Sequence, residues 1–114
     1  MSKLQDIRRL QLLAALKLEA SILVLAKANH ARQISMGQLA GLATEQELPA
    51  DMPEIVGRRA EMTYQRWAEG RRAEINVVLA RQTADWLTAQ DAARAVFGQT
   101  EALKAIVHRM KKGR

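Results

Sequence analysis

Proline occurs at only two positions of this 114-residue chain, Pro49 and Pro53, which lie close together near the middle. Proline breaks helices because it lacks a backbone N–H donor and because its ring clashes with the preceding turn. The rest of the chain is free of this residue and is dominated by Ala, Leu, Glu, Gln, Lys and Arg, which favour helix. The sequence therefore predicts two long helices that are separated by one break.

The expected helix boundaries follow from signals at this break and at the start of the chain. A first helix is expected over about residues 2–43, with Ser2 and Gln5 forming a capping pair at its start. An acidic, proline-containing turn is expected over about 44–52, and a second helix over about 53–111. The whole chain is predicted to be one all-α domain, a long antiparallel two-helix coiled-coil hairpin in which the second helix is longer.

A heptad-like pattern of apolar and small residues marks the predicted contact between the helices. Along the second helix these residues recur at alternating spacings of three and four, with one slip, as in a coiled-coil seam. The first helix carries a similar series at spacings of three, four and seven. The predicted seam consists of Leu4, Ile7, Ala14, Leu18, Leu25 and Ala28 in the first helix, and of Ile75, Val78, Gln82, Trp86, Ala89, Ala93, Val96, Thr100, Leu103, Val107 and Met110 in the second.

Charge is distributed unevenly along the predicted hairpin. The net charge is +6, and residues 34–54 hold four acids and no basic residue, whereas the flanking segments are basic. Because the second helix is longer, Met1 is expected to lie opposite a residue near 100, so that roughly the last dozen residues project beyond the first helix. The hairpin is therefore predicted to be acidic at its turn and basic at its open end. A basic end can meet nucleic acid, anionic lipid or an acidic protein surface.

Two further features are candidates for partner binding. The first helix carries more apolar surface than one seam can cover, and exposed surface of that kind marks a partner site or a self-association face. The residues of this candidate face are Leu12, Leu16 and Leu23. Trp67 and Trp86 belong either to the packing of the hairpin or to exposed anchors for a partner, because tryptophan is favoured at binding hot spots.

The residues of most catalytic and metal sites are missing from this sequence. It has no cysteine, and its two histidines, His30 and His108, are far apart with no ligand spacing around either. No phosphate loop, nucleophile elbow, dinucleotide fingerprint or EF-hand loop is present. We therefore predict a protein that is not an enzyme and that has no catalytic residue, metal or cofactor.

The placement of charges disfavours membrane insertion and nucleic-acid binding. The most apolar stretch, residues 10–28, carries Lys17 and Glu19 at its centre, which argues against a transmembrane span and a signal peptide. Glutamates alternate with arginines along the second helix, whereas a phosphate-tracking face needs continuous positive charge. The expected location is the cytoplasm, with at most a peripheral association with a membrane.

The two ends of the chain resemble those of a known family, the FliJ-type stalk proteins of flagellar and type III secretion export. The start, Leu4-Gln5-Asp6-Ile7-Arg8-Arg9-Leu10, is similar to the opening amphipathic turn of that family. The segment from Arg94 to Ile106 is similar to its closing helix. The family also has the architecture predicted here, a small, basic, cysteine-free hairpin with a longer second helix.

This resemblance implies a non-enzymatic stalk or adaptor function. Members of the family insert the paired ends of the hairpin into a hexameric export ATPase, contact the export gate and recycle export chaperones. That role implies a location at the inner face of the cytoplasmic membrane, beside an export apparatus. The alternatives are a structural coiled-coil oligomerisation subunit and, less favoured, a basic nucleic-acid-binding hairpin. The ATPase-facing residues that the resemblance implies are Leu4, Ile7, Arg8, Leu103, Ile106, Arg109, Lys111 and Lys112.

Overall fold

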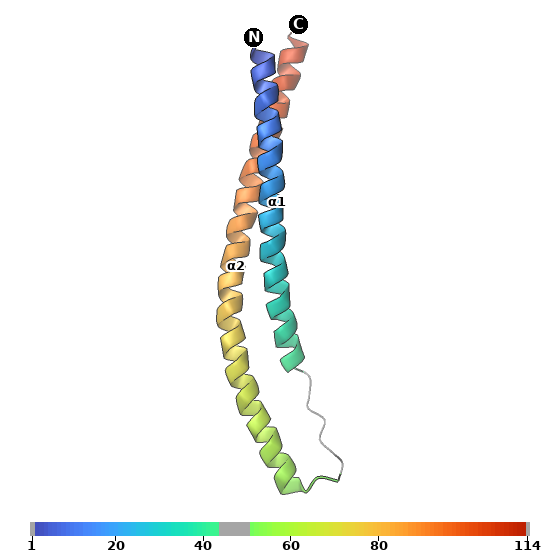
Figure 1. Ribbon diagram of the computed structural model, residues 1–114, viewed down its shortest axis with the longest axis vertical. Coiled ribbons are helices and arrows are strands. Elements are labelled where there is room, and N and C mark those ends of the chain that lie inside the picture. Colours follow the sequence, from blue (N-terminus) through green and yellow to red (C-terminus); the bar gives the residue numbers. More distant parts are fainter. Residues whose placement is uncertain (1, 44–50, 114) are drawn as a thin grey trace. The chain divides into compact units, whose positions relative to one another are not determined.

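The computed structural model describes residues 2–43 and 51–113, which contain two helices (Figure 1). Helix α1 spans Lys3–Leu42, with 40 residues, and helix α2 spans Glu54–Lys112, with 59 residues. The described ranges contain no strand. The predicted all-α fold with a longer second helix is confirmed. Most of the predicted acidic turn, residues 44–50, lies outside the described residues.

Both helices begin where the local sequence favours a start. The Gln5 backbone N–H donates a hydrogen bond to Ser2 Oγ at 3.2 Å, which confirms the predicted cap of α1. In α2, the Gly57 N–H bonds the Pro53 carbonyl at 2.8 Å, so the helix starts directly after this proline. The missing N–H of Pro53 costs nothing at that position, because the first N–H groups of a helix have no partner within it. The last turn of α2 carries Arg109, Lys111 and Lys112, which complement the negative end of the helix dipole.

The helices form two compact units, and each unit contains a segment of α1 and a segment of α2. Unit 1 comprises Met1–Asn29 and Ala84–Arg114, and unit 2 comprises His30–Thr83. The two segments of unit 1 run antiparallel, because residues near the start of α1 and residues near the end of α2 line one groove. Each unit is described separately below.

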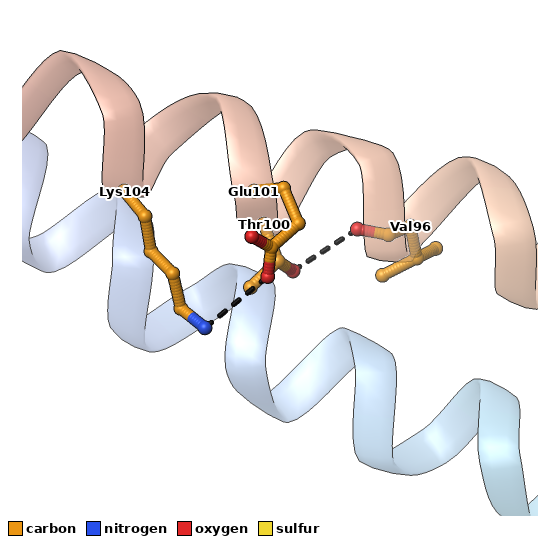
Figure 2. Close-up of polar contacts among 4 residues, drawn as sticks. All are labelled: Val96, Thr100, Glu101 and Lys104. Carbon is orange, nitrogen blue, oxygen red and sulfur yellow. Dashed lines mark hydrogen bonds and ion pairs between the residues drawn. The ribbon is translucent and has the colours of Figure 1, made fainter.

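The core of unit 1 is a narrow seam of small side chains. Along α2 the buried residues, together with the half-buried Leu103, fall at alternating spacings of three and four, as the sequence predicts. The Thr100 hydroxyl would be costly to bury alone, but it donates a hydrogen bond to the Val96 carbonyl at 3.0 Å (Figure 2). Small residues allow two helix backbones to approach closely, and larger seam residues such as Leu18 and Leu103 are only half-buried. The buried residues are Ala14 on α1 and Ala89, Ala93, Val96, Thr100 and Val107 on α2.

The helix register in unit 1 differs from the expected one. Leu13 and Ala14 line a groove together with Ala102 and Leu103, which places these four residues at one level. This level is about ten residues after the start of α1 and about ten residues before the end of α2. Because the segments are antiparallel, the start of α1 therefore lies beside the last turn of α2. The half-buried Met110 agrees with this register. The prediction that roughly the last dozen residues project beyond the first helix is wrong for the described residues, because Lys3 lies level with the last turn of α2.

Unit 2 explains where the extra length of α2 lies. The Ser35 hydroxyl donates a hydrogen bond to Gln82 Oε1, and the Arg32 Nε–H donates one to Thr83 Oγ1 at 3.2 Å. Ser35 is therefore level with Gln82. Since α1 ends at Leu42, seven residues after Ser35, its end is level with a residue about seven positions before Gln82. The additional turns of α2 therefore lie at its start. The sequence-based prediction placed them at the end of α2, because it assumed a tight connection between the two helices.

The seam in unit 2 also differs from the predicted one at a single step. Val78 was predicted to lie in the seam, but it is 48% exposed, and the adjacent Leu79 is half-buried instead. Ile75 is buried as expected. Between Ile75 and Gln82, a seam that passes through Leu79 has spacings of four and three residues. A seam that passes through Val78 has spacings of three and four residues. Both choices satisfy the heptad pattern, so the sequence alone could not separate them.

Substitution to alanine distinguishes these two neighbours. Leu79→Ala should lower the free energy of unfolding by about 1–3 kcal/mol, because it removes half-buried apolar atoms from the seam. Val78→Ala should change it by less than about 0.5 kcal/mol, because the side chain is exposed. Urea denaturation followed by circular dichroism at 222 nm measures both. Equal losses from the two variants would contradict the register described here.

Candidate protein-interaction surfaces

Cationic side chains from both helices meet in unit 1, where the start of α1 lies beside the end of α2. All of them are exposed, and Asp6 is the one acid on α1 among its first four turns. Lys104 also lies on the last turns of α2, but it pairs with Glu101 at 3.2 Å (Figure 2). We call the remaining set the basic end, and it consists of Lys3, Arg8, Arg9, Arg109, Lys111 and Lys112.

The residues implied to face an ATPase divide into two groups. Arg8 and the three cations of the last α2 turn are exposed, and Ile106 is also accessible. Leu4, Ile7 and Leu103 are half-buried and follow the seam between the helices. A partner that approaches this end therefore meets the cations and Ile106 first. The half-buried leucines and Ile7 hold the two helix ends together and thereby position those cations.

The candidate apolar face on α1 is open to solvent. Leu12, Leu16 and Leu23 are 63%, 54% and 62% exposed, and Leu13 and Val24 beside them are exposed as well. The α1 seam in this region contains Ala14 and Ser21, which are small. Leu18 and Leu25 share that seam, whereas the other large apolar side chains of this region lie outside the helix pair. This distribution leaves apolar surface without a partner in the described residues of the chain.

An open groove runs along one side of the seam in unit 1, and the sequence reasoning did not find it. Its volume is about 410 Å³, and its lining is apolar except for one charged residue, Lys17, and one amide, Gln99. A groove between two helices depends on which residues the register places side by side, so no local sequence signal could have shown it. The remaining lining residues are Leu10, Leu13, Ala14, Ala102 and Leu103.

The two tryptophans occupy different environments. Trp67 is exposed, and its ring lies 5.8 Å from that of Tyr64 with an interplanar angle of 40°. This tilted contact fixes the orientation of an accessible aromatic surface in unit 2. Trp86 is half-buried at a seam position of unit 1. Trp67 is therefore accessible to a partner, whereas Trp86 takes part in packing.

Acidic neighbours balance several arginines at the start of α2. Arg58 pairs with Glu54, and Arg71 pairs with Glu74 at 3.2 Å, and all four side chains are largely exposed. Exposed pairs add little stability, but they reduce the positive potential of this face. This part of α2 therefore does not present an uninterrupted track for phosphates.

Within residues 2–43 and 51–113, no group of three or more His, Asp or Glu side chains is arranged to hold a metal ion. Neither described helix has a stretch apolar enough to cross a bilayer. Comparison with known protein families, curated proteins and solved structures finds no match to the chain.

Proposed function

We propose that this chain is a non-enzymatic coiled-coil adaptor that docks its basic end on an acidic surface of a protein partner. The observation that supports this proposal is that cations from α1 and α2 lie together in unit 1. The paired helices hold these cations on a rigid support, which reduces the entropy lost on binding. The accessible Ile106 adds apolar contact at the same place.

The resemblance of the chain ends to FliJ-type stalk proteins gives the partner a specific form. On this proposal the basic end enters a hexameric export ATPase, and other surfaces of the chain contact the export gate and export chaperones. The adaptor acts on the cytoplasmic side of the membrane. The mechanism needs no chemistry from the chain, since a stalk works by binding and by transmitting position through stiff helices.

Charge reversal at the last α2 turn tests this proposal. The variant R109E/K111E/K112E should bind the partner at least about tenfold more weakly, because attraction becomes repulsion at three positions. The remaining affinity should also depend less on salt. The tagged chain is first used to capture its partner from its own cells, and affinity is then measured by titration with the purified partner at two salt concentrations.

A matched control separates the basic end from net charge. The variant R59E/R66E/R81E changes three exposed arginines of α2 in unit 2 by the same total charge. It should retain the parental affinity for the partner within about threefold. Equal losses from the two triple variants, or an unchanged affinity in R109E/K111E/K112E, would overturn docking through the basic end.

A further inference from the structure

One exposed stripe on α1 combines apolar and cationic residues in a regular order. Its members recur at spacings of four and three, lie entirely within unit 1 and are all exposed. The four central residues are apolar, and a cation stands at each end. We call this set the outer stripe, and it consists of Arg9, Leu13, Leu16, Ala20, Leu23 and Lys27.

Most of the outer stripe lies away from α2, and only Leu13 also lines the groove beside Leu103. The seam residues of the same stretch are Ala14, Leu18, Ser21 and Leu25, which are buried or half-buried. At 100° per residue, the centre of the outer stripe is about 150° around α1 from the centre of that seam. A flat surface can therefore approach the outer stripe without displacing α2.

The cations at the two ends of the outer stripe distinguish between two possible binding partners, a second copy of the chain and an anionic surface. A second copy paired in the antiparallel direction would place Arg9 opposite Lys27 of the other copy, and a parallel pairing would place each cation opposite itself. Either arrangement brings like charges together, which is unfavourable. An anionic surface would instead attract both cations, which are about 27 Å apart along the helix.

The flanking charges do not alter this preference. Lys17 and Glu19 border the stripe on opposite sides and balance each other, as do the exposed Asp6 and Arg8 at its start, and the stripe itself contains no acid. Helices that lie in the plane of a bilayer interface bury an apolar face among the acyl chains, while Lys and Arg contact anionic headgroups. Leucines between two cations match that arrangement.

We propose that the outer stripe of α1 is a docking surface for an anionic lipid bilayer, on which the helix lies parallel to the membrane plane. Leu13, Leu16 and Leu23 enter the boundary between headgroups and acyl chains, and Arg9 and Lys27 bind lipid phosphates. The association is peripheral. The outer stripe shares Arg9 with the basic end, whereas its leucines and Lys27 lie outside that set.

Vesicle flotation tests this proposal. The full chain should float with vesicles of phosphatidylglycerol and phosphatidylcholine, and it should float poorly with phosphatidylcholine alone. The variant L16Q/L23Q keeps the charge and should bind at least about tenfold more weakly, because it removes the apolar contact. The variant R9Q/K27Q should lose a similar factor and most of its preference for anionic lipid.

Matched controls and a second readout make the test decisive. The variants V77Q/L87Q and R66Q/R81Q change exposed residues of α2 and should bind vesicles like the parent within about threefold. Circular dichroism checks that all variants keep their helix content. Failure of the parent to float with anionic vesicles, or unchanged flotation of L16Q/L23Q, overturns the proposal. Light scattering that shows a stable dimer, which L16Q/L23Q converts to a monomer, also overturns it, because a second copy then covers the stripe.

Discussion

Replacing Val96 by aspartate should strongly destabilise the hairpin, whereas the same replacement at the adjacent Phe97 should be tolerated. Val96 is 4% exposed, and Phe97 is 54% exposed. An aspartate at position 96 would place a carboxylate at one of the most buried positions of the seam. Burial of an unpaired charge of this kind costs several kcal/mol, even after the surroundings relax. Phe97 is larger and more apolar than Val96, so a ranking by hydrophobicity alone would give the opposite order.

The expected size of the Val96 effect follows from the modest stability of such a fold. Val96→Asp should lower the free energy of unfolding by about 3–5 kcal/mol, which is a large part of the total for a small domain. Phe97→Asp should lower it by less than about 1 kcal/mol. Thermal and urea denaturation, followed by circular dichroism, give both values. Similar losses from the two variants would show that the outward face of α2 near Phe97 is covered by a partner in solution.

The sequence predicted the helices well because each helix depends on local signals. The two prolines allow only one break, and the Ser2 cap and the heptad of small residues mark the start and the inner face of the helices. The choice between Val78 and Leu79 could not be made in this way. It depends on how α2 faces α1 in unit 2, and both alternatives fit the same spacing between Ile75 and Gln82.

The predicted surfaces show the same division between local and long-range information. The surplus of leucines on α1 is a property of one helix, and the exposure of Leu12, Leu16 and Leu23 follows from it. The basic end requires the register of α1 against α2, which the sequence placed incorrectly. The cations still meet, because both helix termini are basic over several turns. The groove around Lys17 needs the same register and had no local signal at all.

Replacing three helical glycines by alanine should stabilise the protein by about 2–3 kcal/mol in total. Gly37, Gly70 and Gly98 lie inside the helices, and a Cβ atom built on each meets no atom within 4 Å apart from its chain neighbours and the adjacent backbone of its own helix. None of them has a positive φ, so alanine fits the backbone without strain. Alanine restricts the unfolded chain and favours helix at each site. The midpoint of thermal unfolding of G37A/G70A/G98A should rise by roughly 10 °C.

Gly113 provides the matched control, because it follows the last residue of α2 and its Cβ would lie 3.5 Å from the Arg109 carbonyl oxygen. Gly113→Ala should therefore change the free energy of unfolding by less than about 0.5 kcal/mol. No stabilisation in the triple variant would contradict the open surroundings of the three sites. A triple variant that is stabilised but no longer captures the protein partner would have a different meaning. Nothing within the described chain approaches these glycines, so the loss would place a partner backbone close to one of them, where a methyl group blocks its approach.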